Sequence, residues 1–437
     1  DGRAIPVQSV RILAPSPSKT SYPEQMKFIV SELKSFLADH RVKVAPDGTF
    51  AVKFVKGDVK TGTENSKLKE EAYSLRVTSG GALITAMDTR GFYYGMKTLE
   101  QLLLRRGGTT TIAACDIVDW PDFEIRGFMN DVGRNYMPLP LIARELDSMA
   151  QLKLNVYHFH FTENPGWRLE SKIYPELNDS RNYTRMPGKF YTQKEFKQLV
   201  EYCRLRNILL IPEMDMPGHS QMFRKALNVK MSDEKATKAL VALIKELCSL
   251  VPKEKMPIIH IGTDEVRGRD EQVNNEILKE YINAVESCGR IPMRWQPGLT
   301  PKGYNGSIQQ LWSGRQNRGA WPTDGAKYVD SLETYLNHLD PFETAMTMYF
   351  RRACPFRNAE GLGMMLCSFP DLEITDPRNQ VLQTPVYAGM AFVSEPLWNN
   401  PHEKVQGDPN QDEYMKYFSN LDISRNFYYN SITIIFF

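Results

Sequence analysis

The sequence predicts a (β/α)8 barrel preceded by a small α+β domain, and three observations lead to this fold class. The chain has 437 residues, which suits a barrel of ~250 residues with additions. From residue 124 onward, short apolar runs alternate with helical stretches, and several of these runs end in acidic, histidine or tryptophan residues. We therefore expect the small domain over residues 1–118 and the barrel over residues 119–437.

The small domain is predicted from local patterns of apolar residues and turn signals. The first helix has Pro23 in its first turn, where proline is tolerated. Two strands flank the turn signal Ser79-Gly80-Gly81. The expected elements are a strand over 7–13, a helix over 22–37, strands over 73–78 and 82–87, and a helix over 91–104.

The barrel is predicted from eight apolar runs, each short enough for a buried parallel strand. The expected strands are 125–132, 155–161, 208–215, 258–264, 291–295, 308–312, 328–332 and 362–369. The intervening helices include 139–152, 193–206, 233–250 and 270–288. In such barrels the active site lies at the carboxyl ends of the strands, so the polar residues that end these runs outline a pocket.

Composition and charge exclude several classes of partner. Hydrophobic residues make up 42% of the chain, charged residues 24%, and the formal charge is +2 without runs of like charge. No nucleic-acid partner is therefore expected. No apolar stretch approaches the ~18 residues of a membrane span. We expect a secreted, periplasmic or cell-surface protein whose export signal is absent from this sequence. The six scattered cysteines favour buried thiols over disulfides or a metal site.

The sharpest local signal is the pair Asp264-Glu265, which ends the fourth predicted barrel strand. Adjacent carboxylates at a strand end are costly unless they are solvated, paired or used in chemistry. A helix N-cap by Asp264, with Glu265 in the first turn, is the structural alternative.

Three further motifs end the preceding barrel strands: residues 126–134, 153–168 and 212–220. Together with Asp264-Glu265, they closely resemble family 20 glycoside hydrolases, the β-N-acetylhexosaminidases. The resemblance also covers residues 71–77 and 91–103 of the small domain, and it extends from residue 5 to residue 400. It implies a retaining exo-enzyme that uses the substrate's own acetamido group as its nucleophile.

The resemblance assigns the catalytic roles to three residues. Glu265 would protonate the leaving oxygen and then activate water. Asp264 would hold the acetamido N–H, direct the acetamido oxygen at C1 and stabilise the positive charge of the oxazolinium intermediate. Tyr335 would donate to the acetamido oxygen. The chemistry needs no metal and no organic cofactor.

Other positions are implied to bind the substrate. Arg126 would hold hydroxyl groups on the far side of the terminal sugar, and Trp295 and Trp312 would wall its acetamido methyl group and ring. His219 would link the catalytic acid to a carboxylate on the second strand. Here that carboxylate is Glu163, where an aspartate is usual in the family. Core packing is the alternative for each aromatic residue.

The sequence departs from the family pattern around the same pocket. After Tyr335 it has Asn337 and His338 where Leu-Asp is frequent. Residues 366–369 replace a Leu-Trp run that precedes an acid, which predicts the loss of an aromatic wall and of a second carboxylate. Loss of these carboxylates predicts tolerance of a substituent at C6, with a 6-O-sulfate as the best candidate. Neutral drift and a different local alignment are the alternative explanations.

The resemblance implies a hexosaminidase that acts on an oligosaccharide or glycoconjugate. Two other functions are alternatives to it. His158-x-His160 with His219 and Asp264 resembles part of an amidohydrolase metal site, but the fifth and sixth predicted strands contain no histidine. A catalytically weak glycan-binding barrel is the non-enzymatic alternative. Either GlcNAc or GalNAc fits as the terminal sugar.

Overall fold

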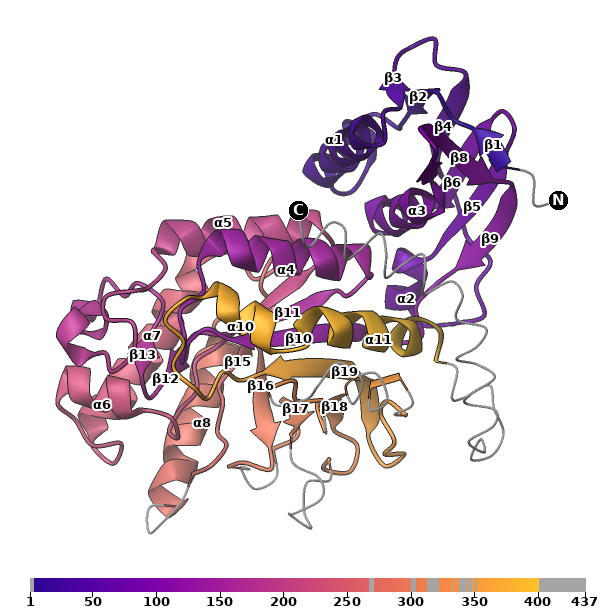
Figure 1. Cartoon of the computed structure of the whole chain (residues 1–437). Helices are drawn as coiled ribbons and strands as arrows, with labels where there is room; N and C mark the ends of the chain where they lie inside the picture. The colour runs from indigo at the N-terminus through magenta and orange to yellow at the C-terminus, as the bar shows by residue number, and fades with distance from the viewer. Residues whose placement is uncertain are drawn as a thin grey trace. The chain divides into compact units, whose positions relative to one another are not determined.

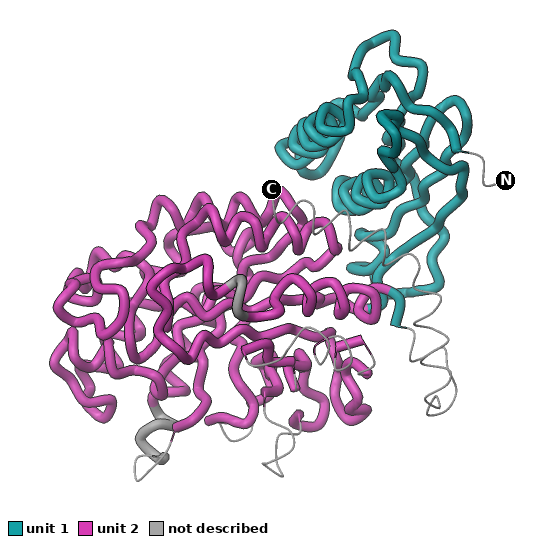
Figure 2. The backbone as a smooth tube through the Cα atoms, viewed as in Figure 1, with its two compact units in different colours: residues 1–122, 399–437 teal, residues 123–398 magenta. Residues whose placement is uncertain are grey.

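The structure is a computed structural model that describes residues 4–266, 271–299, 304–312, 322–332, 334–337, 344, 348–349 and 352–400, with the backbone alone over 271–276 and 381–383. The described chain divides into two compact units, residues 4–122 together with 399–400, and Phe123–Trp398 (Figure 2). The domain boundary predicted after residue 118 lies shortly before this division. His338 and residues 401–437 lie outside the described residues.

The first unit is an α+β domain built on a mixed six-stranded sheet with the order β3-β2-β4-β6-β5-β9. A second sheet has the order β1-β8-β7. The strands are β1 (Ala4–Pro6), β2 (Ser9–Leu13), β3 (Lys43–Val44), β4 (Phe50–Lys56), β5 (Tyr73–Thr78), β6 (Gly81–Ala86), β7 (Leu104–Arg106), β8 (Thr109–Ala113) and β9 (Cys115–Asp119). The helices are η1 (Pro17–Lys19), α1 (Pro23–Asp39), α2 (Ser66–Glu71) and α3 (Thr89–Leu102).

Helices α1 and α3 lie on the same side of the six-stranded sheet (Figure 1). Apolar side chains of α1 such as Ile29 and Leu33 are fully buried, as is Phe92 of α3. The predicted hairpin is present as β5 and β6, paired antiparallel from Tyr73 to Ala86. Strand β4, which pairs in parallel with both β2 and β6, was not predicted.

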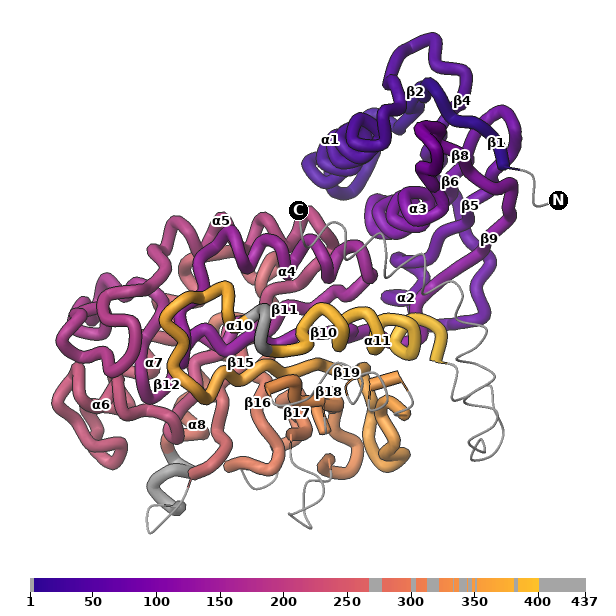
Figure 3. Tube along the Cα trace, in the orientation of Figure 1, coloured from indigo at the N-terminus to yellow at the C-terminus, as the bar shows by residue number. Residues whose placement is uncertain are grey.

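The second unit is a closed barrel of eight parallel strands in chain order, as the sequence predicts. The strands are β10 (Ile125–Asp131), β11 (Val156–His160), β14 (Leu209–Glu213), β15 (Ile258–His260), β16 (Ile291–Gln296), β17 (Ile308–Leu311), β18 (Lys327–Asp330) and β19 (Glu360–Ser368). β19 closes the barrel by pairing with β10 from Ile125↔Gly363 to Asn130↔Ser368, and the two strands lie side by side in Figure 3.

Helices and short elements lie between the strands of this unit, and two of the described helices follow its last strand. The helices are α4 (Leu139–Gln151), α5 (Gln193–Leu205), α6 (Gln221–Leu227), α7 (Glu234–Leu250), α8 (Glu271–Ser287), α10 (Arg378–Gln383) and α11 (Val386–Asn399). The short elements are β12 (Thr162–Glu163), β13 (Gly166–Trp167), η2 (Pro175–Asn178) and η3 (Ser180–Asn182). Among the described helices, none has the length and apolar character required to cross a membrane.

The barrel interior is apolar towards the amino-terminal ends of the strands and polar towards their carboxyl-terminal ends. Alternate residues of each strand point inward, and inward residues such as Val156, Ile211 and Met293 form one buried apolar cluster. Near the carboxyl ends of β11 and β14 the inward positions become polar, with His160 and Glu213 both buried. The described strands therefore present their polar side chains at the end of the barrel where such enzymes bind substrate.

Candidate active site

The segment that carries Asp264 and Glu265 follows β15 in a constrained backbone conformation. Thr263 and Glu265 have φ angles of 90° and 49°, which residues with a side chain seldom adopt. A Cβ atom at Gly218 would lie 2.5 Å from the carbonyl oxygen of Asp264, so the turn after β14 presses directly against this segment. Strained conformations of this kind persist where the surroundings fix them, and they concentrate at functional sites.

Asp264 and Glu265 differ in exposure. The side chain of Asp264 is 15% exposed and that of Glu265 is 44% exposed. Burial raises the pKa of Asp264, contact with His219 lowers it, and the charge of Glu213 raises it again. The two carboxylates thus offer different environments at one strand end, a buried anion site and an accessible proton donor or acceptor.

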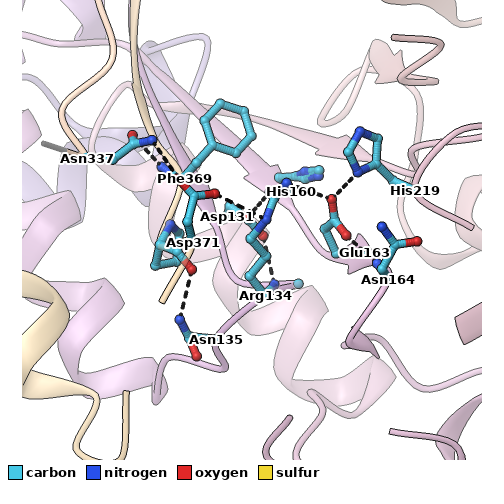
Figure 4. Close-up of polar contacts among 12 residues, drawn as sticks. Asp131, Arg134, Asn135, His160, Glu163, Asn164, His219, Asn337, Phe369 and Asp371 are labelled. Carbon is cyan, nitrogen blue, oxygen red and sulfur yellow. Dashed lines mark hydrogen bonds and ion pairs between the residues drawn. The ribbon is translucent and has the colours of Figure 1, made fainter. Parts of the chain in front are cut away.

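His219 lies between Glu163, in the segment after β11, and Glu265, in the segment after β15. Its Nε2 atom is 3.4 Å from Glu265 Oε2 and 3.7 Å from Asp264 Oδ2. Its Nδ1 atom contacts Glu163 Oε1 (Figure 4). Although burial lowers the pKa of His219, the charges of Asp215, Glu163 and Asp264 outweigh it and raise that pKa to about 11. His219 is therefore positively charged at neutral pH.

Glu163 reaches His219 despite being one methylene longer than the usual aspartate. It belongs to the β12–β13 hairpin, and its Cβ would lie 2.9 Å from a Cβ placed on Gly133. The absence of a side chain at Gly133 therefore lets this hairpin approach the end of β10. Glu163 Oε1 also lies 3.0 Å from Arg134 Nη2, so this carboxylate joins His219 to Arg134.

Asp215 is a buried carboxylate that supports the segment after β15. Its Oδ1 accepts a 3.2 Å hydrogen bond from the backbone N–H of Thr263. Its own backbone N–H donates to Thr162 Oγ1 at 2.9 Å. Burial, and next the charge of Asp264, raise the pKa of Asp215 well above its ordinary value. Asp215 consequently ties the end of β14 to the segment after β15.

The structure corrects the prediction for Arg126. This residue lies at the start of β10, at the opposite end of the strand from Asp131. It is fully buried, and its guanidinium donates to the backbone carbonyls of Phe123 and Lys153 at 2.8 and 2.9 Å. It also lies over the ring of Trp398, 5.0 Å from the centroid. Arg126 therefore stabilises the amino-terminal end of the barrel, away from Asp264 and Glu265.

Arg134 occupies the position that Arg126 was expected to fill. It follows the carboxyl end of β10, and its backbone N–H donates to Asp131 Oδ1 at 2.9 Å. Its guanidinium contacts the carboxylates of Asp131, Glu163 and Asp371, with Nε 3.7 Å from Asp371 Oδ1 (Figure 4). This fork of donors at the mouth of the barrel is suited to sugar hydroxyls.

The predicted aromatic residues lie around one apolar cluster inside the barrel. Trp295 is buried, Trp312 and Tyr335 are partly buried, and Phe369 packs against the same cluster. Trp312 Nε1–H donates to the carbonyl of Pro297 at 2.6 Å. The rings of Tyr335 and Phe369 stack with centroids 5.2 Å apart. The end of β19 thus retains an aromatic wall, which the sequence interpretation of residues 366–369 had taken as lost.

Tyr335 is held by the backbone of β19 and placed among charged groups. Cys367 N–H donates to the carbonyl of Thr334, and Leu336 N–H donates to that of Cys367. Burial raises the pKa of the Tyr335 hydroxyl well above its ordinary value, and the groups of Cys367 and Asp264 add to the effect. Tyr335 therefore stays protonated and can donate a hydrogen bond.

Asn337 is paired with a carboxylate that was not singled out from the sequence. Its Oδ1 accepts from the backbone N–H of Phe369 at 3.0 Å, and its Nδ2 lies 3.4 Å from Asp371 Oδ2. The Asp371 side chain is 49% exposed. The mouth of the barrel therefore keeps a carboxylate beside Asn337, supplied by the segment after β19.

One group of buried residues has the side chains that could hold a metal ion. Ligand atoms of His158, Glu213 and His260 lie within 4.8 Å of one another. Glu213 Oε1, however, already accepts a 2.6 Å hydrogen bond from Trp295 Nε1–H, and Oε2 lies 2.8 Å from His158 Nε2. These contacts organise the carboxylate within the protein. His158 and His160 accordingly belong to the barrel interior.

Sequence reasoning missed Arg134, Glu213, Asp215, Phe369 and Asp371 as parts of the site. A usable signal existed for the arginine, because residues after the carboxyl end of a barrel strand face the site and residues at its start do not. Glu213 and Asp215 stand in the motif after the third strand without a distinguishing local pattern. The two residues after β19 depend on the course of a loop.

Comparisons with known proteins agree with this architecture. The model for glycosyl hydrolase family 20, domain 2, matches residues 8–120, and the model for the catalytic domain of the same family matches residues 123–238. A β-hexosaminidase of Vibrio furnissii is 32% identical over 238 residues, 46% of this chain and 38% of that protein. The β-hexosaminidase subunit beta of Mus musculus is 32% identical over 216 residues, 45% of this chain and 39% of that protein. The matched regions span less than two fifths of these curated relatives.

Solved structures share the fold over most of the chain. The β-N-acetylhexosaminidase of Bacteroides fragilis NCTC 9343 has a TM-score of 0.74 at 22% identity, covering 98% of this chain and 93% of that chain. A mutant Streptomyces plicatus β-hexosaminidase in complex with GlcNAc has a TM-score of 0.75 at 20% identity, covering 93% and 89%. Two consecutive domain models of one family, together with a barrel that ends in its motifs, establish that the chain belongs to glycoside hydrolase family 20.

Proposed function

We propose that the chain is a retaining exo-β-N-acetylhexosaminidase that releases terminal β-linked GlcNAc or GalNAc from an oligosaccharide or glycoconjugate. The observation that carries this proposal is the Asp264-Glu265 pair at the end of β15, with charged His219 within 3.4 Å of Glu265. The Vibrio furnissii and Mus musculus relatives are both named as β-hexosaminidases, which supports this activity.

In the first step, the carbonyl oxygen of the substrate's acetamido group attacks C1 from the face opposite the leaving group. Glu265 gives its proton to the glycosidic oxygen as the C1–O bond breaks. A bond forms between the acetamido oxygen and C1, and the sugar becomes a cationic oxazolinium ion. Asp264 accepts the acetamido N–H and stabilises this positive charge. Tyr335 donates its hydroxyl hydrogen bond to the acetamido oxygen and directs it at C1.

In the second step, Glu265 acts as a base. It takes a proton from water, and the resulting oxygen nucleophile attacks C1 on the face that the aglycone left. The bond between C1 and the acetamido oxygen breaks, which restores the neutral acetamide. Two inversions at C1 leave the product with the configuration of the substrate, which is the definition of a retaining enzyme.

The remaining side chains hold the sugar and tune the acid. His219 lies between Glu265 and Glu163, so it keeps a positive charge beside the group that must release and take up the proton. Arg134 lies at the barrel mouth with its guanidinium directed among three carboxylates, from which it can donate to sugar hydroxyls. Trp312 and Phe369 provide apolar ring surface for the sugar's C–H faces.

A 6-O-sulfated sugar is proposed to be tolerated but not preferred. Asn337 removes one negative charge relative to the family pattern, which favours a sulfate. Asp371 restores a carboxylate 3.4 Å from Asn337 Nδ2, which opposes it, while the guanidinium of Arg134 lies on the other side of Asp371. We therefore expect sulfated substrate to be hydrolysed more slowly than the plain sugar.

The test is release of a chromogenic aglycone from β-GlcNAc, β-GalNAc and 6-sulfo-β-GlcNAc by the unmodified chain and by Glu265→Gln. The proposal expects the plain sugars to be cleaved and the variant to lose turnover by ~10²–10⁴-fold, the range for a general acid or base. Glu145→Gln, a buried carboxyl on α4 bonded to Asn130, is the matched control and should retain activity.

Binding of GlcNAc separates the two candidate functions. Glu265→Gln should keep its affinity for GlcNAc, because it removes a proton and not the pocket. If the unmodified chain binds the sugar without cleaving any of the three substrates, the glycan-binding barrel is the correct function. If Glu265→Gln turns over as fast as the unmodified chain, the assignment of Glu265 is wrong.

A further inference from the structure

Glu213 is a buried carboxylate beneath the site, and the mechanism above gives it no task. It ends β14 with its side chain inside the barrel and no exposed surface. Its Oε1 accepts a 2.6 Å hydrogen bond from Trp295 Nε1–H and lies 3.1 Å from His260 Nδ1. Its Oε2 lies 2.8 Å from His158 Nε2 and 3.4 Å from His160 Nδ1.

A carboxylate in this position is costly and is not required for a stable core. Burial of a charge is unfavourable unless donors surround it, and apolar residues of similar volume often replace buried ionic groups without loss of stability. The donors here come from two different strands, Trp295 from β16 and His158 from β11. A group that gathers this many partners in a barrel interior is a candidate for function.

The charge of Glu213 reaches the catalytic groups above it. Burial dominates the raised pKa of Asp264, and the charge of Glu213 adds to it. For Glu213 itself burial would raise the pKa, but contacts with His160, His260 and His158, among them the hydrogen bond from His158, outweigh burial and hold that pKa well below its ordinary value. Burial lowers the pKa of His158 to about 4, so that ring is neutral and contributes an N–H rather than a charge. The cluster therefore keeps an ionised carboxylate under the sugar site.

Glu213 is also linked to the catalytic segment through His260. The backbone N–H of Gly262 donates to His260 Nδ1 at 3.1 Å. Gly262 opens the turn that carries Thr263, Asp264 and Glu265. The indole of Trp295, fixed by Glu213, packs edge-on against the ring of His260 with centroids 5.0 Å apart. One carboxylate thus contacts both the aromatic floor and the ring that holds the start of the catalytic turn.

We propose that Glu213 is a positioning residue for the reaction, with two tasks. Its Oε1 fixes the indole of Trp295 under the sugar, and its negative charge stabilises the cation that forms above that indole. The inference rests on the proposed function, because it needs a reaction in which positive charge develops on the sugar. Glu213 does not touch the substrate and exchanges no proton with it.

Two variants separate these tasks. Glu213→Gln retains an oxygen that can accept from Trp295 Nε1–H but removes the charge. Glu213→Asp retains the charge but is one methylene shorter, so it loses the bond to Trp295. The probes are turnover of chromogenic β-GlcNAc, and calorimetric binding of neutral GlcNAc and of a cationic 2-acetamido iminosugar. Glu145→Gln is again the matched control for loss of a buried carboxyl.

For Glu213→Gln we expect kcat to fall by ~10–100-fold with KM changed less than about threefold, the pattern for a contact that matters in the transition state. Its affinity for the cationic iminosugar should fall at least about tenfold while its affinity for GlcNAc stays unchanged. For Glu213→Asp the ratio of cationic to neutral affinity should stay near that of the unmodified chain. Its affinity for GlcNAc should fall several-fold as Trp295 is released.

The outcomes are distinct for the inference and for the proposed function. Unchanged kcat and unchanged iminosugar affinity in Glu213→Gln, with normal turnover by the unmodified chain, would overturn the role of Glu213 alone. Absence of turnover by the unmodified chain would overturn the proposed function and this inference with it. If Glu213→Gln fails to fold, judged by thermal unfolding beside Glu145→Gln, Glu213→Asp decides: an unchanged affinity for GlcNAc, or a cationic-to-neutral ratio that falls although the charge is retained, would overturn the inference.

Discussion

The two sides of the barrel mouth are built differently. The acid side (Glu163, His219, Asp264 and Glu265) follows β11, β14 and β15, and its members contact one another directly. The rim side (Tyr335, Asn337, Phe369 and Asp371) follows β18 and β19, and its polar contacts run largely through the backbone and through half-exposed Asp371. Arg134 touches a carboxylate on each side.

This difference indicates that the acid side and the rim side have different tasks. On the acid side, His219 and Glu265 adopt φ angles of 45° and 49°, so their positions are fixed at a conformational cost that the surroundings must offset. On the rim side, the sequence departs from the family pattern while keeping an aromatic ring and a carboxylate. The acid side is therefore suited to set the reaction, and the rim side to set which sugar is accepted.

The largest contrast between the two sides is expected from Asp264→Asn. Loss of the anion proposed to receive the acetamido N–H should lower kcat by ~10²–10³-fold, the range for removing one preorganised electrostatic contact. The measurement is steady-state hydrolysis of chromogenic β-GlcNAc. Asp371→Asn, a matched change on the rim side, should lower kcat by less than about fivefold. Similar losses for both variants would contradict the division between the two sides.

Arg134 and Arg126 give the next largest contrast. Arg134→Lys keeps the charge but loses the planar fork that spans three carboxylates, so kcat/KM should fall by ~10–100-fold, mainly through KM. Arg126→Lys should leave KM within about twofold and instead lower the free energy of unfolding by about 2 kcal/mol, because the ammonium group does not reproduce the planar guanidinium that donates to two buried carbonyls. The measurements are substrate saturation curves and urea unfolding. A raised KM in Arg126→Lys alone would restore the original sequence interpretation.

These two arginines also show how far the sequence could lead. The eight barrel strands were predicted because each is a short apolar run with polar residues at its end, as in Ile125–Asp131. Both arginines stand in one motif, and only their positions at opposite ends of that strand distinguish them. The sequence predicts the motif, whereas the end of the barrel that each residue faces follows from the register of the strand.

Other misses have similar physical causes. Strand β4 contains Lys53 and ends with Lys56, and both side chains are exposed. The apolar run that would indicate a strand is therefore short and broken in the sequence. Phe369 and Asp371 reach the site because the chain turns after β19, with Asn135 Nδ2 donating to the carbonyls of Pro370 and Leu372. Loop courses of this kind depend on tertiary contacts between residues more than 200 positions apart.

The charge on the acid side predicts a pH-dependent stability. The pKa of His219 is about 11 in the folded protein against 6.5 for an ordinary histidine. A raised folded-state pKa means that the stabilisation is fully present below pH 6.5 and is lost as the pH rises from 6.5 towards 11. Each pKa unit corresponds to about 1.4 kcal/mol, and coupling to Asp215, Asp264 and Glu163 spreads the effect, so we expect a loss of about 2 kcal/mol between pH 6.5 and 9.

His219→Gln is the variant that tests this dependence. Its free energy of unfolding, measured by urea titration at pH 6.5, 8 and 9, should decline with pH less steeply than that of the unmodified chain. The difference between the two proteins should therefore shrink as the pH rises. A constant difference in the free energy of unfolding across this range would mean that the neighbouring carboxylates do not keep His219 protonated in the folded protein.

The smallest expected effect concerns the rim side and the sulfate. Asp371 lies beside Asn337 and is half exposed, so water screens its charge and its influence on a nearby sulfate is modest. Asp371→Asn should raise the ratio of kcat/KM for 6-sulfo-β-GlcNAc to that for β-GlcNAc by about two- to fivefold, and low salt should enlarge the change. Asp116→Asn, which removes an exposed, arginine-paired carboxylate in the first unit, controls for net charge. An unchanged ratio in Asp371→Asn would place the C6 group away from the rim side and leave substrate choice to the acid side.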